Sequence, residues 1–171
     1  AGAFPRHVAQ EAKRQGLRVV AIDIQHWVDP ALATQVDTYE EIAIGQLGRL
    51  IERLAAHHVR QAVMAGKVTK EVLFDARVQF DAEAVEVLRH VKDFSVNGLL
   101  GAIASRLAHH GVTLLDSSTF LKDHLCPAGV LTQRQPTEME QTDIHLGVQA
   151  ARQLAHLDIG QTVVVKQGVI V

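Results

Sequence analysis

The sequence predicts an α/β fold in which a mostly parallel β-sheet carries helices on both faces. Short apolar runs of strand length alternate with stretches whose apolar residues recur at helical spacing, and glycines mark the junctions. Buried strands joined by helices pair in parallel through right-handed crossovers. The chain has 171 residues, of which 47% are hydrophobic, and this suffices for the core of one ordinary domain.

The first predicted unit is a helix followed by a strand. Phe4, Val8 and Ala12 recur at helical spacing, Gly16 ends the helix, and residues 17–24 form a nearly continuous apolar run. The opening Ala-Gly-Ala-Phe-Pro is typical of a turn between a strand and a helix, and no strand precedes it. We therefore expect the first strand of the sheet to be missing.

Two further units follow the same pattern. In the second, a short strand over 41–44 leads through a glycine turn into a helix with Leu47, Leu50, Ile51 and Leu54 on one face, and a strand covers 61–65. In the third, a helix spans the apolar positions from Val96 to Leu107, Gly111 ends it, and residues 112–115 form a strand. The His pairs at 57–58 and 109–110 fall at the C-termini of these two helices, where an imidazolium favours the negative end of the dipole.

The C-terminal part begins with an irregular stretch over 126–136. Thr137 and Glu140 then form a capping box that opens another helix. We expect a first domain over 1–157, with 158–171 forming a linker and the first strands of a truncated second domain. The β-branched runs around Gln167 predict a hairpin with a bare apolar edge, which indicates a piece of a longer protein.

The composition argues against some classes of function and favours others. A formal net charge of -2 and the absence of a Lys/Arg block argue against nucleic acid and favour a small-molecule ligand. Cys126 is the single cysteine and cannot form an internal disulfide, and its loop position is better explained by packing than by nucleophilic catalysis. No stretch of the chain has the length and apolarity of a membrane-spanning helix, and we expect a cytoplasmic protein.

Glycine turns at three strand ends are the candidate ligand site. Gly2 precedes the first helix, Gly45 and Gly48 precede the second, and Gly66-Lys67 follow the strand that ends near Ala65. Backbone N–H groups and helix dipoles at such turns favour phosphate. Any single glycine is better explained as a tight turn, and Lys67 equally well as a solvated surface charge. The three together favour a phosphate or nucleotide crevice. The carboxylates of Asp75, Asp93, Asp116 and Asp143 are more often caps than catalysts, although Asp116, at the end of a strand, is placed where a ligand could reach it.

A set of motifs resembles one family over essentially the whole chain. Their order and spacing are similar to those of the LpxI-type UDP-2,3-diacylglucosamine pyrophosphatases. The motifs are Gly45-Gln46-Leu47-Gly48, Met64-Ala65-Gly66-Lys67-Val68 with Leu73-Phe74-Asp75, Pro127-Ala128-Gly129-Val130-Leu131-Thr132, and Asp158-Ile159-Gly160-Gln161 through Val169.

The resemblance implies a Mg²⁺-dependent hydrolase of Gram-negative lipid A synthesis that splits UDP-2,3-diacylglucosamine into UMP and 2,3-diacylglucosamine 1-phosphate. It also implies a Rossmann-like N-terminal domain, a lipid nucleotide held between two domains, and at most peripheral contact with the inner membrane. The substrate-binding residues that it implies are Gly2, Phe4, Gly45, Gln46, Gly66, Lys67, Thr132 and Gln161. Gln161 is explained equally well as the start of the hairpin.

We assign no catalytic or metal-binding residue within the chain. In the family, an acidic Gly-Thr-Asp segment implicated in catalysis follows the equivalent of Val171, and Asn97 stands where relatives tend to be acidic. The fragment is therefore expected to be inactive by itself. The alternative is a non-catalytic nucleotide-sugar binding or regulatory module on the same fold. A Rossmann oxidoreductase is disfavoured, because no Gly-x-Gly-x-x-Gly followed about twenty residues later by an acidic residue is evident.

Overall fold

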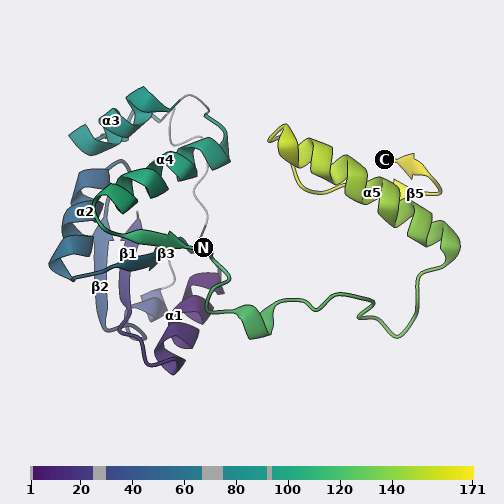
Figure 1. Ribbon diagram of the computed structural model, residues 1–171, viewed down its shortest axis with the longest axis horizontal. Coiled ribbons are helices and arrows are strands. Elements are labelled where there is room, and N and C mark those ends of the chain that lie inside the picture. The colour runs from purple at the N-terminus through teal and green to yellow at the C-terminus, as the bar shows by residue number, and fades with distance from the viewer. Residues whose placement is uncertain (1, 25–29, 67–74, 92–93) are drawn as a thin grey trace. The chain divides into compact units, whose positions relative to one another are not determined.

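The computed structural model describes residues 2–24, 30–66, 75–91 and 94–171, and the chain divides into two compact units over 1–125 and 126–171. Unit 1 contains all the parallel strands of this part of the chain. Its elements are α1 (Phe4–Arg14), β1 (Val20–Ile24), η1 (Pro30–Leu32), β2 (Thr38–Ile42), α2 (Leu47–Ala56), β3 (Gln61–Val63), α3 (Ala82–His90), α4 (Val96–His109), β4 (Thr113–Leu115) and η3 (Lys122–His124). Unit 2 contains α5 (Glu138–His156), β5 (Val165–Lys166) and β6 (Val169–Ile170) (Figure 1).

The α1–β1 step follows the sequence closely. Pro5 occupies the first turn of α1, where its missing N–H costs nothing, and Val8 and Ala12 are buried on one face. Gly16 has φ +78°, and the N–H of Leu17 donates to the carbonyl of Ala12 at 3.1 Å. This contact is the C-terminal closure that a left-handed glycine allows, and it confirms Gly16 as the helix stop.

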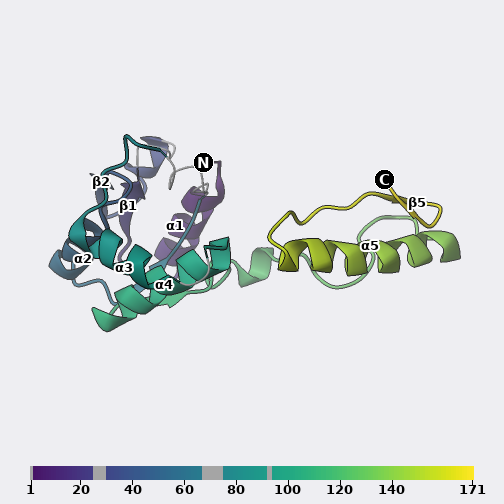
Figure 2. The same cartoon turned by 90° about the horizontal axis from the view of Figure 1, so that it is seen from above.

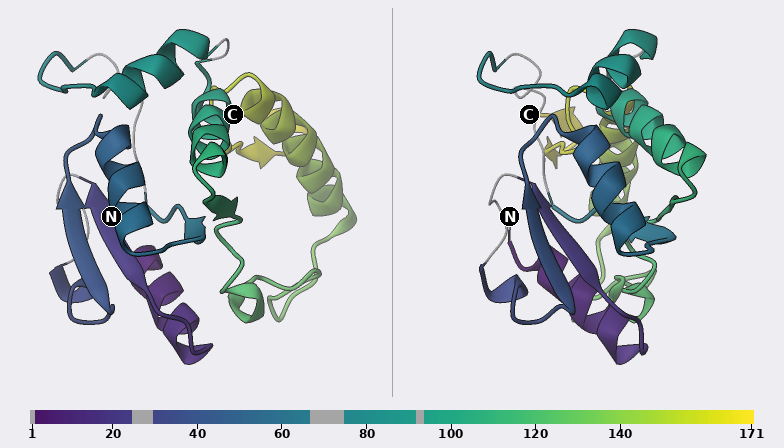
Figure 3. Two further views of the ribbon diagram at one scale, coloured as in Figure 1. Left: turned by 60° about the vertical axis from the view of Figure 1, so that its left-hand side comes forward. Right: turned by 90° about the vertical axis from the view of Figure 1, so that its left-hand side faces the viewer.

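The strands of unit 1 pair in parallel, as the sequence predicts. β1 pairs with β2 in a register that runs from Val20 opposite Thr38 to Ile24 opposite Ile42, and β3 pairs with β4. Figure 3 shows the two long strands pointing the same way. The expected single sheet is instead two separate parallel pairs within the described residues, because each of these strands is hydrogen-bonded to one neighbour. The mixed α/β class is confirmed, and the finer Rossmann-like arrangement stays a prediction.

β2 begins and ends earlier than the predicted strand over 41–44. Its pairing with β1 starts at Thr38, and the carbonyl of Ala43 already accepts the N–H of Gln46 in a turn. The strand boundary is therefore set by its partner strand and by the turn that follows, neither of which apolar spacing reveals.

The core of unit 1 lies between α2, α4 and the strands. Ile51 and Leu54 of α2 pack with Leu107 of α4 and with Val112, and Ile22 of β1 lies against this cluster. The predicted apolar face of α2 therefore faces the core. Figure 2 shows α2, α3 and α4 next to one another in this unit.

Helix α3 is missing from the sequence-based prediction. Asp81 is its N-cap, accepting the backbone N–H of Ala84, and Ala84 is its one buried residue. Because so little of α3 is buried, its apolar pattern is weak, and periodicity alone does not reveal the helix.

Both predicted His pairs lie at helix C-termini. His57 is the C-cap of α2, while His109 ends α4 and His110 is its C-cap. His57 also forms a short contact with the carboxylate of Glu40 in β2. The imidazole therefore lies at the C-terminus of α2 and beside an acidic side chain of β2.

Unit 2 is a helix with a hairpin attached to it. The β5–β6 hairpin is antiparallel, and the carboxylate of Asp143 in α5 accepts the backbone N–H groups of Gln167 at 2.9 Å and Gly168 at 2.7 Å. These contacts group α5 with the hairpin, so the structure divides the chain after Leu125 instead of after residue 157. The two β-branched runs around Gln167 form the predicted hairpin.

The predicted capping box is present at the start of α5. The Oγ1 of Thr137 accepts the N–H of Glu140, and the Glu140 carboxylate accepts the N–H of Thr137. Arg134 adds two hydrogen bonds to the same carboxylate, at 2.7 and 2.8 Å. These contacts, led by that of Arg134, lower the pKa of Glu140 from 4.5 to about 2.

The lowered pKa predicts acid sensitivity at the start of α5. Because the folded state favours ionised Glu140, its contribution to helix stability is fully present above the ordinary pKa of 4.5 and is lost as the pH falls toward about 2. We expect the backbone amide signals of the first turn to shift over this range in NMR spectra of the whole chain. The variant Glu140→Gln should remove this transition, and Glu138→Gln, in the same turn, should keep it. An unchanged transition in Glu140→Gln would contradict the assignment.

No helix within residues 2–24, 30–66, 75–91 and 94–171 is long and apolar enough to cross a bilayer.

Candidate functional site

The turn between β2 and α2 depends on a glycine. Gly45 has φ +89°, and a Cβ at this position would lie 2.7 Å from the backbone oxygen of Gln79. The carbonyl of Gly45 accepts the N–H of Asp81 at 3.1 Å. A side chain would push these two segments apart, so the turn requires glycine for both its backbone conformation and its close neighbour.

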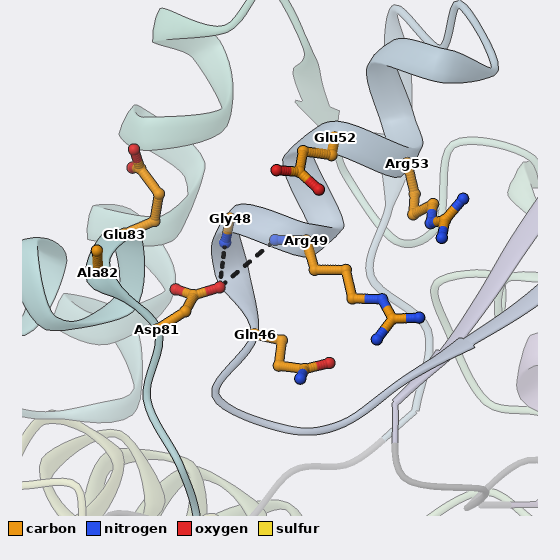
Figure 4. Close-up of a pocket in the computed structure, with 8 residues that line it drawn as sticks. All are labelled: Gln46, Gly48, Arg49, Glu52, Arg53, Asp81, Ala82 and Glu83. Atoms are coloured by element: carbon orange, nitrogen blue, oxygen red, sulfur yellow. Dashed lines mark hydrogen bonds between the residues drawn. The ribbon is translucent and has the colours of Figure 1, made fainter.

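Asp81 links the starts of two helices. One carboxylate oxygen accepts the N–H of Gly48 at 2.7 Å and approaches the N–H of Arg49 at 3.4 Å, and the other accepts the N–H of Ala84 at 2.9 Å. The first two contacts are drawn in Figure 4. A carboxylate thus occupies the positive end of α2, where the sequence predicts that an anionic ligand could bind.

A pocket of about 600 Å³ opens beside this carboxylate. Its lining combines the glycine turn, the first two turns of α2 and the start of α3. The lining residues are Gln46, Gly48, Arg49, Glu52, Arg53, Asp81, Ala82 and Glu83. Because this turn follows the carboxyl end of a parallel strand, the pocket lies where α/β proteins commonly hold ligands.

The cations of the pocket differ in their partners. The guanidinium of Arg53 pairs with Glu40 at 3.1 Å, whereas that of Arg49 makes no hydrogen bond or ion pair with any residue that the structure describes. The side chains of Arg49 and Gln46 extend to the same side of the turn in Figure 4. The Oε1 of Gln46 accepts the N–H of Ala43 at 3.1 Å, which holds the amide in place. A guanidinium and a fixed amide are suitable donors for a phosphate.

The acidic side of the pocket is paired only in part, because Glu52 also lines it and makes no hydrogen bond or ion pair with any residue that the structure describes. Glu83 accepts the Nε of Arg106 at 2.6 Å, which connects α3 to α4. Asp81 is engaged by backbone N–H groups as described. The negative charges near the pocket are therefore already balanced in part by groups of the protein, and Arg49 is left to interact with a ligand.

The other predicted binding residues of unit 1 lie outside this pocket's lining. Gly2 has φ +82° with open space around it, and Phe4 begins α1, whose N-cap Ala3 provides no side-chain hydrogen bond. Gly66 follows β3 with φ +134°, and Lys67 lies outside the described residues. Of the predicted set, the structure brings only Gln46 to the pocket, with Gly45 shaping the turn beneath it.

The two candidates of unit 2 are exposed. The Oγ1 of Thr132 donates to the carbonyl of Arg134 at 2.8 Å within a local turn, and Gln161 lies between α5 and the hairpin. Their roles as ligand-binding residues stay predictions.

The remaining carboxylates have local structural partners. Asp75 accepts hydrogen bonds from the Arg77 side chain and N–H, which lower its pKa to about 2. Asp116, at the end of β4, accepts from the hydroxyl and N–H of Ser118, and its pKa is lowered as well. Asp93 lies outside the described residues. Asp75 and Asp116 therefore have the capping and turn roles that the sequence favours.

Sequence reasoning missed Asp81 and Arg49. The available signal for Asp81 was an acidic residue directly before an Ala-Glu-Ala run, which is a helix start. Arg49 carried no comparable signal, because a single arginine on a helix resembles any solvated surface charge. Its relevance follows from the turn and from the lack of an ion pair between its guanidinium and any residue that the structure describes.

The resemblance implies Mg²⁺ for the parent enzyme, with no metal ligand assigned within this chain. Within the described residues, no three His, Cys, Asp or Glu side chains come together as potential metal ligands. The Mg²⁺ that the resemblance implies for the parent enzyme therefore stays a prediction, and we derive no step through it.

Unit 1 thus belongs to the class of α/β proteins with a ligand pocket at the carboxyl end of a parallel strand. The chain is a member of the LpxI family: the LpxI N-terminal domain model matches residues 1–124, and the LpxI C-terminal domain model matches residues 127–171. The family models and the compact units divide the chain at the same place, before α5.

One curated relative is the UDP-2,3-diacylglucosamine pyrophosphatase LpxI of Caulobacter vibrioides. It is 25% identical to this chain over 174 residues, which cover 99% of the chain and 60% of the relative. The chain therefore spans less than two thirds of the length of this relative.

Proposed function

We propose that this chain is the nucleotide-binding part of a UDP-2,3-diacylglucosamine pyrophosphatase and that the pocket at the start of α2 binds the diphosphate of the substrate. The proposal follows the family membership and the name of the Caulobacter relative. The proposal depends on one observation. The guanidinium of Arg49 forms no ion pair with the described residues, and it lies beside a glycine turn at the carboxyl end of β2.

Two side chains of the pocket are suitable donors for a diphosphate. Arg49 would form charge-assisted hydrogen bonds to phosphate oxygens, and the Nε2 of Gln46 would donate a further one. Asp81 keeps the turn and α3 in place through its three N–H contacts. Its negative charge also disfavours an anion in direct contact with the N-terminus of α2. The diphosphate is therefore expected to contact the side chains of Arg49 and Gln46.

In the proposed reaction, a water oxygen bonds to the α-phosphorus of the UDP-lipid, and the bond from this phosphorus to the bridging oxygen breaks. UMP and 2,3-diacylglucosamine 1-phosphate are released as phosphate monoester dianions, and the two protons of the water pass to solvent. The role of the described residues is to bind and orient the diphosphate; no residue of this chain is assigned to activate the water. The Mg²⁺ requirement implied by the resemblance is part of the proposal.

Binding and turnover can be tested separately. The 171-residue chain is titrated with UMP by NMR, and it is assayed for UMP release from UDP-2,3-diacylglucosamine with and without Mg²⁺, with the Caulobacter relative as the reference. We expect measurable UMP binding and no UMP release. Failure to bind UMP would contradict the pocket assignment. Release at a rate comparable with the relative would show that the chain itself contains the catalytic groups.

Arg49→Gln tests the residue on which the proposal depends. Loss of charge-assisted hydrogen bonds to phosphate is expected to weaken UMP binding about tenfold or more. Arg89→Gln is the matched control, because Arg89 on α3 is 72% exposed and lies outside the pocket. Equal UMP affinities in the two variants would rule out a role for Arg49 in binding the phosphate.

A further inference from the structure

One buried carboxylate in unit 1 has an oxygen without a partner. Asp23 in β1 is 2% exposed, and it is the one buried polar residue among those that the structure describes. Its Oδ1 has no hydrogen-bond partner there. Burying such an acceptor without a hydrogen bond is destabilising, and more so when it is charged. A buried group of this kind calls for an explanation beyond packing.

The other oxygen of Asp23 is held by Tyr39. The phenol donates to Oδ2 at 2.8 Å, and Ala21, two residues before Asp23, is the register partner of Tyr39. Since side chains alternate along a strand, Asp23 and Tyr39 lie on the same face of the β1–β2 pair. Burial, followed by the carboxylates of Asp23 and Glu41, raises the pKa of Tyr39 far above its ordinary value. The phenol therefore stays a donor, and it orients the Asp23 carboxylate.

Asp23 lies at the ligand-binding end of the sheet. It is next to the last residue of β1, and its register partner is Glu41, which lies shortly before the Gly45 turn. Neighbouring strands are about 4.8 Å apart, so Asp23 and the turn that leads to the pocket lie at the same edge.

We propose that the Oδ1 of Asp23 accepts a hydrogen bond from a ribose hydroxyl of the bound nucleotide. Tyr39 is a positioning residue that holds the other oxygen. This inference rests on the proposed function and adds to it the sugar that unit 1 selects. A ribose hydroxyl supplies the donor that the buried oxygen lacks, and a deoxyribose lacking that hydroxyl leaves it unpaired.

The experiment compares UMP with its 2′-deoxy and 3′-deoxy analogues. Each is titrated by NMR into the isotope-labelled 171-residue chain, into Asp23→Asn and into the control Asp37→Asn. Asp37 precedes β2 and pairs with Lys13 at 2.6 Å, at the opposite end of the strand pair. We expect the wild-type chain to bind UMP about tenfold more tightly than at least one analogue, the size expected for a hydrogen bond to a charged group.

The variants separate the possible results. Asp23→Asn is expected to reduce the preference to within about twofold, because Asn offers one oxygen, which Tyr39 occupies, and an amide N–H₂ donor in place of Oδ1. Asp37→Asn should keep the wild-type preference. Equal binding of UMP and both analogues by the wild-type chain, or an unchanged preference in Asp23→Asn, would overturn the assignment of Asp23 and leave the Arg49 pocket standing. Failure of UMP itself to bind would overturn both.

Discussion

Replacing Leu107 by alanine is expected to destabilise unit 1 by about 2–5 kcal/mol, the range for large-to-small changes in a packed core. Leu107 in α4 is 3% exposed and is the most buried member of the cluster with Ile51, Leu54 and Val112. Its removal leaves a cavity where α2 and α4 meet the strands. Because whole domains of this size are stable by about 5–15 kcal/mol, the variant should lose much of its folded population.

The measurement is amide hydrogen exchange in the whole chain, read at the core residues Ile51 and Leu54. This readout reports the opening of unit 1 without assuming that both units unfold together. Leu100→Ala is the control: it lies on the same helix, and its side chain is 40% exposed, so we expect a loss below about 1 kcal/mol. Similar exchange in the two variants would show that α4 is not anchored through Leu107.

Replacing Asp81 by alanine is expected to destabilise unit 1 by about 2–4 kcal/mol. The substitution removes the N-cap of α3, which is worth about 1 kcal/mol. It also removes the contacts to the start of α2, where hydrogen bonds to a charged group contribute about 1.5–3 kcal/mol. The two helices lose a shared anchor. Protection of the amides at Gly48 and Ala84 should therefore fall together.

Two further variants separate these contributions. Asp81→Asn keeps one carbonyl oxygen, which can accept hydrogen bonds from the start of a single helix, while its N–H₂ group faces the other helix as a donor. We therefore expect this variant to be destabilised about half as much as Asp81→Ala. Ser95→Ala removes the Ser95 cap of α4 and should cost about 1 kcal/mol. A loss in Asp81→Ala no larger than that in Ser95→Ala would contradict the shared role of Asp81.

These results bear on the site, because Asp81 forms one wall of the pocket that contains Arg49. If Asp81→Ala loosens the turn, UMP binding should weaken even though the carboxylate itself is not expected to contact the phosphate. A variant that is destabilised but keeps its UMP affinity would place the binding site elsewhere in unit 1.

Much of the fold could be predicted because short local sequence patterns indicate several of its elements. Gly16 ends α1 in the conformation that glycine allows, Thr137 and Glu140 form the expected capping box, and the apolar face of α2 packs into the core. Each of these depends on residues within a few positions of one another. Helix α3 was missed because its stability depends on the Asp81 cap and on neighbouring helices more than on an apolar stripe.

The candidate site was predictable in part for the same reason. The glycine turn and Gln46 could be identified from their motif, whereas the importance of Arg49 depends on which acidic groups are already paired. Glu40 forms an ion pair with Arg53, and Glu83 forms one with Arg106. Each of these ion pairs joins two different elements. No spacing rule along the chain predicts which charge is left without a partner.

By itself, the sequence determined the α/β class, the family resemblance, the glycine turn and most helix limits, since these follow from periodicity, caps and motifs that are local in the chain. Only the tertiary structure showed that α5 belongs with the hairpin, that Asp81 occupies the start of α2, and that Asp23 is buried with one oxygen unpaired. Burial and hydrogen-bond partners across distant segments arise from packing. A carboxylate near a strand end has the same sequence pattern whether it is solvated, a cap or a ligand for ribose.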